Sequence, residues 1–251
     1  GGKLGDILGH KRLFAIGMFI FITGSCLIAL AHRELWVVIN RGIQGLGAAL
    51  LIPPINVIVI SNFCDKTRGR AMGIQVAIAS IFLSIGPLIG GYLTEEYSWR
   101  WIFWINLPIG IISTAVVVLC TPKILRSIHK IPAYIDWIGF ILSAAAIFCI
   151  TFALMQTGQW GWTNKTNLLM FALGAICIYA FYKFEKKQKH PLVDFNLFKD
   201  PGFLNGSLIL LLIQTNFIAR IFIIIYFQTV LGYSVLMAGV LSLPGTVPVL
   251  F

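Results

Sequence analysis

Residues 13–31 read LFAIGMFIFITGSCLIALA, a run without a single charged side chain. The hydrocarbon core of a bilayer is about 30 Å thick, and an α-helix needs about 20 apolar residues to cross it. Further apolar stretches follow at Leu35–Ile60, Gly69–Leu93, Ile102–Cys120, Ile135–Gln156, Leu168–Phe184 and Phe203–Phe227, and another begins near Val235. Backbone groups in lipid must be satisfied within their own segment. The pattern therefore predicts an all-α polytopic membrane protein, a bundle fragment of about eight helices with the last incomplete.

Composition indicates that lipid is the solvent for much of the chain. Hydrophobic residues make up 58% of it, charged residues make up 11%, and the mean hydropathy is +0.89. Soluble domains carry about 25% charged residues, so these charges are too few to cover a surface in water. The net charge of +10 does not indicate nucleic-acid binding, because the basic residues lie in short clusters between apolar runs. Nucleic-acid binders instead gather them on one polar face.

The basic residues predict the side of the membrane on which each connection lies. Alternate connections hold clusters of them: Lys3, Lys11 and Arg12; Lys66, Arg68 and Arg70; Lys123, Arg126 and Lys130; Lys183, Lys186, Lys187, Lys189 and Lys199. The connections between these hold only Arg33, Arg100 and Lys165. Cytoplasmic connections carry the excess of Lys and Arg. We therefore expect the Lys3, Lys66, Lys123 and Lys186 loops to be cytoplasmic, in the plasma membrane of a bacterial cell.

A charged side chain within a span is costly and therefore points to function. Arg41 lies near the start of the second stretch, beside Gln44 and the small residues Gly42, Gly45 and 47–49. A small-residue surface lets another helix approach closely, so we expect Arg41 to face the interior of the bundle. The alternative is an arginine that extends along its helix to the outer interface.

Arg220 is a second such charge, and it forms a polar group with Gln214 and Asn216 midway along Phe203–Phe227. Asn216 and Arg220 share one face of the helix at four residues' separation. No acidic residue lies at the middle of a predicted span, so a carboxylate partner would come from elsewhere. The group predicts a substrate or ion pathway, with a structural role as the alternative. Asp136 opens the fifth stretch and is expected to cap its helix.

Neither a metal centre nor a catalytic site is predicted. The cysteines show no CxxC and no metal-ligand spacing: Cys26, Cys64, Cys120, Cys149 and Cys177. The histidines all lie in predicted loops: His10, His32, His129 and His190. A membrane-embedded hydrolase needs a nucleophile and a base, or metal ligands, within a span. We expect no enzyme, no metal and no prosthetic cofactor, and keep a membrane-embedded receptor or enzyme as a remote alternative.

Several motifs, in this order, resemble those of the major facilitator superfamily. Residues 2–12, GKLGDILGHKR, resemble its signature loop G-x-L-a-D-r-x-G-r-k between the second and third helices. Residues 41–49, RGIQGLGAA, resemble R-x-x-Q-G-x-G-a-a of the fourth helix, and residues 86–91, GPLIGG, resemble the G-P-x-x-G-G antiporter motif of the fifth. Residues 99–110, WRWIFWINLPIG, are similar to W-R-W-x-F-x-x-N-x-P-x-G of the fourteen-helix drug:proton antiporters, and 136–139 and 191–194 resemble further features of that branch.

The resemblance implies a role for each motif. Asp6 would bond to a helix end or a basic group in one transport state, within a conformational latch loop that comprises Gly2, Asp6, Gly9, Lys11 and Arg12. Arg41, with Gln44, would take part in proton coupling by tuning a carboxylate on the first helix. The antiporter motif would pack the two halves of the transporter together through Gly86, Pro87, Gly90 and Gly91.

The sequence also departs from the family pattern. Ile7 stands where the family has Arg after the loop aspartate, which weakens any charge network around Asp6. Phe82 stands where a glycine usually precedes the antiporter motif. The acidic motif of the first helix would precede Gly1, so the expected proton carrier is outside this sequence.

We interpret the chain as an internal fragment that covers family helices three to nine and part of ten. Residues 1–121 would end the N-terminal bundle, 122–190 would hold two extra central helices with their flanking loops, and 191–251 would start the C-terminal bundle. The predicted function is proton-coupled efflux of amphipathic or cationic drugs by alternating access, driven by the proton gradient. The predicted partners are such a small molecule, protons and the lipid bilayer, with accessory export proteins left open. An exporter of a specific metabolite or siderophore is the alternative.

Overall fold

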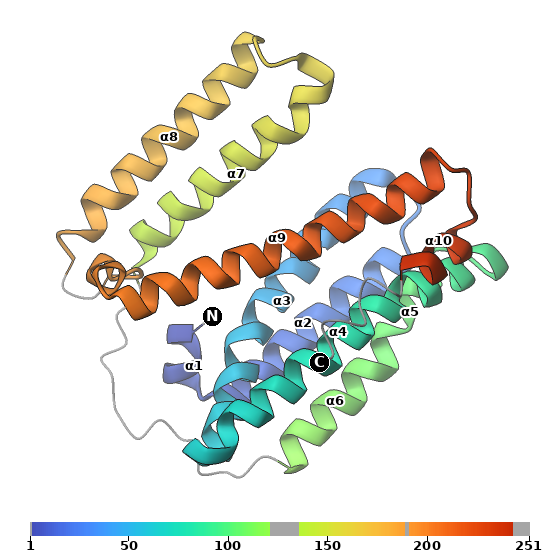
Figure 1. Ribbon diagram of the computed structural model, residues 1–251, viewed down its shortest axis with the longest axis horizontal. Coiled ribbons are helices and arrows are strands. Elements are labelled where there is room, and N and C mark those ends of the chain that lie inside the picture. The colour runs from blue at the N-terminus through green and yellow to red at the C-terminus, as the bar shows by residue number, and fades with distance from the viewer. Residues whose placement is uncertain (1, 121–135, 189–190, 243–251) are drawn as a thin grey trace. The chain divides into compact units, whose positions relative to one another are not determined.

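The computed structural model describes residues 2–120, 136–188 and 191–242, and every regular element within these ranges is helical (Figure 1). This confirms the all-α prediction. Within the described helices, a few side chains lie outside the description: Ser84, Ile213, Gln214, residues 216–221, Val235, Leu236 and Ser242.

Six spans of the described chain are long and apolar enough to cross a membrane. They are α2 (His10–Ala29), α3 (Glu34–Asn62), α4 (Asp65–Glu96), the pair α5 (Trp101–Trp104) and α6 (Asn106–Cys120), α7 (Trp137–Trp160) and α8 (Lys165–Glu185). They correspond to the first six predicted stretches. The seventh is covered by α9 (Pro201–Thr229), and α10 (Val235–Ser242) begins the eighth, whose remainder lies outside the described residues.

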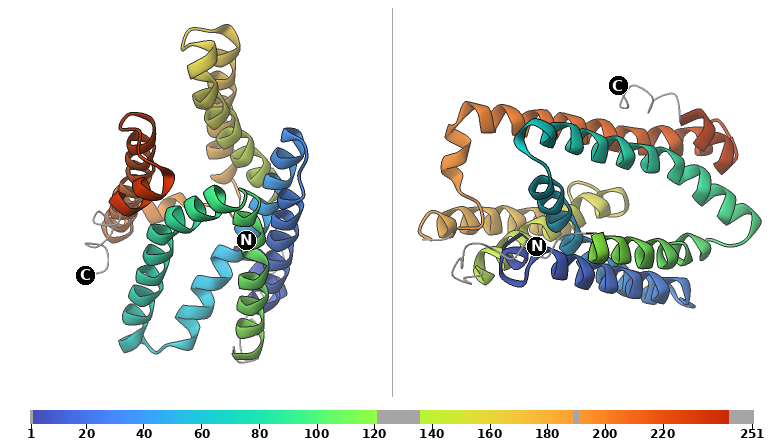
Figure 2. Two further views of the ribbon diagram at one scale, coloured as in Figure 1. Left: turned by 90° about the vertical axis from the view of Figure 1, so that its right-hand side faces the viewer. Right: turned by 90° about the horizontal axis from the view of Figure 1, so that it is seen from below.

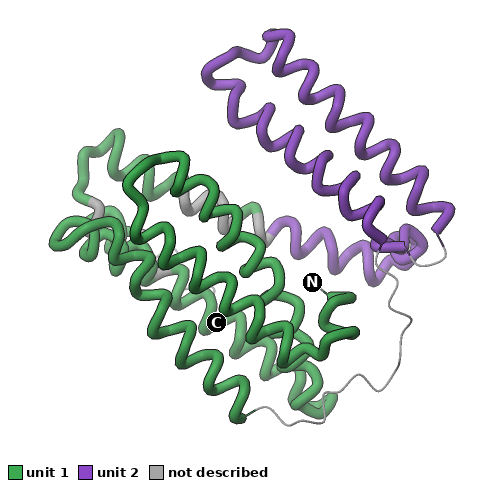
Figure 3. Tube along the Cα trace, turned by 180° about the vertical axis from the view of Figure 1, so that it is seen from behind, with its two compact units in different colours: residues 1–132, 215–251 green, residues 133–214 purple. Residues whose placement is uncertain are grey.

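The chain forms two compact units, which Figure 3 colours separately. Unit 1 comprises Gly1–Pro132 and Thr215–Phe251, and unit 2 comprises Ala133–Gln214. Within unit 1, α2 packs against α3, α5 and α6, and α4 packs against α10. Figure 2 shows α2 and α6 side by side in this unit.

Glycines allow α2 and α3 to approach one another closely. A Cβ atom at Gly47 would lie 2.7 Å from the Cα of Phe21, and a Cβ at Gly24 would lie 2.9 Å from the Cα of Gln44. Both separations are well inside van der Waals contact, so neither position has room for a larger residue. The predicted small-residue surface is therefore found at Gly47, where it receives α2.

The other part of that predicted surface has no such contact in the described chain. Gly42 and Gly45 have no neighbouring atom within 4 Å of where a Cβ would lie. The buried face of α3 instead carries Gln44, Gly47 and Leu51, which recur at the spacing of one helical stripe. Gly42 and Gly45 fall outside this stripe.

In unit 2, α7 and α8 pack together as a helical hairpin. Gly161 ends α7 with φ 81°, a left-handed conformation that favours glycine. The buried Asn167 of α8 donates to Thr157 Oγ1 at 2.9 Å and to the carbonyl of Gly161 at 3.2 Å. Midway along the hairpin, a Cβ at Gly174 would lie 2.6 Å from Ile150 Cγ1. Close packing and a polar turn therefore both hold the two helices together.

Replacing Gly47 by alanine is expected to separate α2 from α3, because the new Cβ overlaps the backbone of Phe21. Overpacking of this kind costs about 1–3 kcal/mol, which lowers the melting temperature of the detergent-solubilised protein by at least about 3 °C. Gly45→Ala is the matched control on the same helix, where the Cβ enters open space. Equal melting temperatures for the two variants would contradict the close approach of α2 to α3 at Gly47.

Candidate functional site

The candidate site is built around Arg41 on α3. Arg41 and Gln44 are three residues apart and therefore lie on neighbouring positions of one helix surface. The Nη1 of Arg41 donates to Oε1 of Gln44 at 3.3 Å, and Gln44 is itself buried against α2 at Gly24. The guanidinium carbon lies 4.8 Å from the ring centroid of Phe103 on α5. Arg41 is thus held by the amide of Gln44 on one side and by the ring of Phe103 on the other. The face of an aromatic ring attracts the guanidinium cation electrostatically.

Phe103 is held in place by a hydrogen bond to its backbone carbonyl. The hydroxyl of Ser25, buried in α2, donates to the carbonyl of Phe103 at 2.9 Å. The amide of Asn106 donates to the same hydroxyl at 3.0 Å. The Phe103 side chain is buried with Ile28 and Ala29 of α2. The ring beneath Arg41 is therefore positioned by α2.

Arg100 extends this arrangement by a second cation and a second ring. Its Nη2 donates to the carbonyl of Ala31 at 2.8 Å, just beyond the end of α2, where helix carbonyls lack partners and a cation is favourable. Its guanidinium carbon lies 4.7 Å from the ring centroid of Trp99. Trp99 in turn meets Phe103 edge-on at 5.9 Å. The two rings thus lie next to one another, with Arg41 over Phe103 at one end and Arg100 over Trp99 at the other.

The sequence identified Arg41 and Gln44 but not their partners. Phe103 and Ser25 lie far from Arg41 along the chain, and no local pattern joins them. One signal was available: Phe103 and Asn106 are three residues apart within the W-R-W-x-F-x-x-N stretch, which places them on neighbouring positions of a helical surface.

The predicted latch loop is mostly helical. Helix α1 (Gly2–Leu8) contains Asp6, and α2 begins at His10, so Gly9 alone separates them. Gly9 has φ 88°, which favours glycine. The remaining predicted members also lie in helices, Gly2 in α1 and Lys11 and Arg12 in α2. Asp6 Oδ1 lies 3.3 Å from Nε2 of His10 across the break. His10 is therefore the basic side chain that lies against Asp6, and the expected loop is a helix–glycine–helix turn.

The GPLIGG segment lies in α4, the helix that packs against α10. Helix α4 runs through the motif without a break, and all four predicted residues lie on it: Gly86, Pro87, Gly90 and Gly91. A Cβ at Gly239 of α10 would lie 3.0 Å from Cδ2 of Leu88 within the motif. A glycine on α10 thus allows this approach.

The predicted polar group on α9 is placed only by its backbone. Gln214, Asn216 and Arg220 all fall within α9, but their side chains lie outside the described part of the structure.

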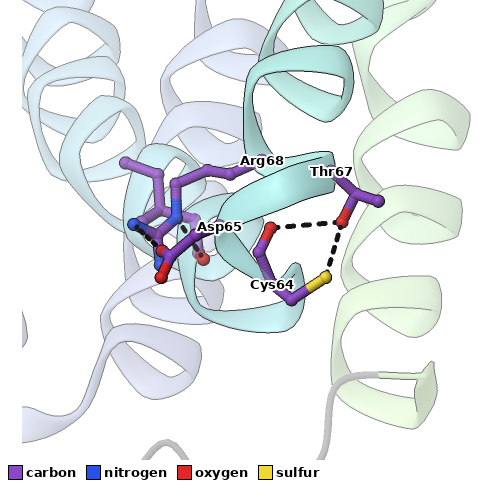
Figure 4. A network of polar contacts seen from close by, with 5 residues as sticks. Cys64, Asp65, Thr67 and Arg68 are labelled. Atoms are coloured by element: carbon purple, nitrogen blue, oxygen red, sulfur yellow. Dashed lines mark hydrogen bonds and ion pairs between the residues drawn. The ribbon is translucent and has the colours of Figure 1, made fainter.

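The connection between α3 and α4 carries an exposed thiol in a small polar network (Figure 4). Cys64 is the N-cap of α4, and its Sγ lies 3.2 Å from Oγ1 of Thr67. This hydrogen bond, with the backbone amides of the helix start, lowers the pKa of the Cys64 thiol. Asp65 pairs with Arg68 at 2.9 Å, and Arg68 Nε donates to the carbonyl of Ile60 at 3.3 Å. The network ties the start of α4 to the end of α3.

The sequence model of the major facilitator superfamily matches residues 1–251. The chain belongs to the major facilitator superfamily. This confirms the resemblance drawn from the motifs, and the six apolar spans agree with the integral membrane transporters of that family.

This major facilitator chain is similar to several curated transporters. It is 33% identical over 245 residues to Multidrug resistance protein 3 of Bacillus subtilis (strain 168), covering 97% of this chain and 47% of that protein. It is 35% identical over 246 residues to the Uncharacterized MFS-type transporter EfpA of Mycobacterium tuberculosis (strain ATCC 25618 / H37Rv), covering 97% and 46%. The Methylenomycin A resistance protein of Bacillus subtilis (strain 168) is 30% identical over 246 residues, covering 97% and 52%. The chain spans about half the length of these relatives.

Replacing Ser25 by alanine is expected to weaken the packing of Phe103 against α2 in this major facilitator chain. The substitution removes the donor to the Phe103 carbonyl and the acceptor of Asn106. Buried polar groups left unpaired cost about 1–3 kcal/mol, so the melting temperature falls by at least about 2 °C. Ser113→Ala is the control, because the Ser113 hydroxyl bonds only the carbonyl of Ile109 in its own helix. Indistinguishable melting curves for the two variants would refute the role of Ser25.

Proposed function

We propose that this protein is a proton-coupled exporter of amphipathic or cationic drugs that works by alternating access. The observation that carries the proposal is Arg41, a cation within a membrane span, held by Gln44 and by the ring of Phe103. Charges within a membrane span are rare and mark ion or proton pathways.

The geometry of Arg41 suits a group that tunes a carboxylate. Gln44 accepts one hydrogen bond from the guanidinium, and the ring of Phe103 holds the guanidinium by its face, so other N–H donors of the five remain available. Among the described residues, Asp65 pairs with Arg68 and Asp6 lies against His10, and Arg41 takes part in neither contact. A carboxylate that approaches Arg41 has its pKa lowered, and it takes up a proton when it moves away. That cycle is what proton coupling requires.

The relatives support the class of substrate. Their names describe multidrug resistance, methylenomycin A resistance, and tetracenomycin C resistance and export. Hydrophobic sites tolerate varied shapes, while a few polar groups set orientation. An exporter of one defined metabolite or siderophore is the second candidate, because two of these names specify a single natural product.

The other motifs supply the moving parts in this proposal. Asp6 and His10 form a latch that holds one state, and the contact of Leu88 with Gly239 packs α4 against α10, the second helix of the proposed C-terminal bundle. Arg220, Gln214 and Asn216 of α9 contribute to the substrate and ion pathway. The proposed division assigns residues 1–121 to the N-terminal bundle, 122–190 to the two extra central helices and 191–251 to the C-terminal bundle.

The proposed location is a bacterial plasma membrane, with the Lys3, Lys66 and Lys186 connections in the cytoplasm. The Lys123 connection is assigned to the same side, although it lies outside the described residues. Multidrug resistance protein 3, EfpA and the Methylenomycin A resistance protein, to which the chain is similar, come from bacteria.

Everted membrane vesicles that contain the complete transporter test the proposal. Adding ethidium is expected to release protons from the vesicle lumen, and a pH-sensitive dye reports them. Arg41→Ala is expected to lower this signal by at least about 10-fold, which corresponds to a loss of about 1.4 kcal/mol or more of coupling. Arg33→Ala, a charge at the exposed start of α3, is the control. Proton release that survives in Arg41→Ala would refute the coupling role, and none with any of a broad cation panel would favour the single-metabolite exporter.

Labelling of Cys64 tests the proposed sidedness. In a variant that keeps Cys64 as its sole cysteine, a membrane-impermeant maleimide is expected to react in inside-out but not right-side-out vesicles. The thiolate is the reactive form, and the lowered pKa of the Cys64 thiol enlarges its share at neutral pH. Thr67→Val removes the hydrogen bond that contributes most to this lowering, so labelling near neutral pH becomes slower. Labelling from the outside would reverse the proposed orientation.

A further inference from the structure

Two carboxyl groups are buried against one another at one end of the α7–α8 hairpin. Asp136 precedes α7 and is 1% exposed, and Glu185 ends α8 and is 2% exposed. Carboxylates are almost never fully buried unless they are paired. In the described chain, neither takes part in an ion pair, and both lie in unit 2.

Each carboxyl group uses one oxygen for a backbone hydrogen bond. Asp136 caps α7, as predicted, because its Oδ1 accepts from the amide of Gly139 at 2.9 Å. Glu185 Oε2 accepts from the amide of Leu192 at 2.8 Å, in the segment that follows α8. The second oxygens, Oδ2 of Asp136 and Oε1 of Glu185, are buried and have no hydrogen-bond partner.

These two free oxygens converge on the same small space. A Cβ placed on Gly139 would lie 2.5 Å from Oε1 of Glu185 and 2.7 Å from Oδ2 of Asp136. Glycine at this position therefore leaves room for the two oxygens to face one another. An ionised carboxylate has only acceptors, so two ionised groups satisfy neither oxygen, and their like charges repel in a medium of low dielectric constant.

The neighbouring cations do not offset the repulsion between two ionised carboxylates. Lys183 and Lys186, in the last turn and at the C-cap of α8, lie over the rings of Tyr179 and Tyr182, at 5.2 and 4.5 Å from the ring centroids. Asp194, in the following segment, is exposed and accepts from Asn196. The two remaining oxygens are also fewer than the six to eight that Ca²⁺ takes.

We propose that Asp136 and Glu185 bind one shared proton and so form a protonatable site in the α7–α8 hairpin. The proton lies between Oδ2 and Oε1, where it makes one carboxyl group a donor to the other. The protonated pair ties the start of α7 to the end of α8, and through the Leu192 amide it ties both to the following segment. Loss of the proton leaves two buried like charges and weakens all three connections. This site does not involve Arg41 and does not depend on the proposed antiport.

The sign of the pH dependence follows from the count of bound protons. In the unfolded chain both carboxyl groups are ionised above about pH 5, whereas the folded pair keeps one proton. The folded state therefore binds more protons, and stability falls as the pH rises. The melting temperature of the full-length protein in detergent is expected to drop by roughly 3–10 °C between about pH 5 and pH 8.

Asp136→Asn separates this site from other acids in the protein. The amide keeps the oxygen that accepts from Gly139 and offers a permanent donor to Glu185, so the melting temperature loses most of its pH dependence over this range. The infrared band of a protonated carboxylic acid, present in the wild type at neutral pH, decreases in the variant. Asp200→Asn is the matched control. Its carboxylate also accepts from a backbone amide next to a helix start, that of Gly202 at 2.8 Å, but it is exposed.

Glu185→Gln provides an independent second variant, with the amide donor on the other side of the pair. The proposal is overturned if the wild-type melting temperature does not change with pH. It is also overturned if Asp136→Asn keeps the wild-type slope and acid band. Failure of both amide variants to fold would likewise overturn it, because each supplies the hydrogen bond that the shared proton makes.

Discussion

The close approach of α2 to α3 at Gly24 and Gly47 determines the arrangement of the candidate site. Because Gly24 has no side chain, the backbone of Gln44 lies directly against α2. Gln44 is therefore buried between α2 and α3, where it bonds to Arg41. The next residue of α2 is Ser25, which holds the carbonyl of Phe103. One helix therefore fixes both the amide and the ring that contact Arg41, and a shift of α2 would disturb both contacts together.

The way in which the described polar groups are hydrogen-bonded follows from the absence of water in lipid. Hydrocarbon offers no hydrogen bonds, so buried polar groups need partners within the protein. Ser25 and Asn106 satisfy one another between α2 and α6, and Asn167 finds Thr157 in the turn of the hairpin. The exceptions among the described residues are Nδ1 of His10, Oδ1 of Asn167 and the facing oxygens of Asp136 and Glu185. For the carboxyl pair, a shared proton would supply the missing hydrogen bond without any change in the positions of the heavy atoms.

Hydropathy predicted the positions of the six spans because the thickness of the bilayer sets a length that is read directly along the chain. The basic clusters and motifs likewise led to Arg41 and Gln44. The contacts of Arg41 were not predictable, because Phe103 reaches it through the packing of α5 on α2. The same holds for Glu185, which meets Asp136 only when α7 and α8 fold back on one another. At the other end of the chain, the stretch around Asp6 is helical up to Gly9, whose positive φ breaks the helix while its amide still donates to the carbonyl of Gly5.

Arg41 and the carboxyl pair differ in what each does with a proton. A guanidinium keeps its charge at every accessible pH, so in the proposed coupling Arg41 would act only by changing the pKa of an acid that approaches it. Its contacts with Gln44 and Phe103 suit this task, because both hold the cation without neutralising it. The pair in unit 2 has the opposite property, since its net charge changes by one when a single proton leaves. The proposed coupling at Arg41 and the proposed proton site in unit 2 are therefore distinct in kind. The second involves unit 2 alone, because both carboxyl groups and the amides that bond to them belong to it.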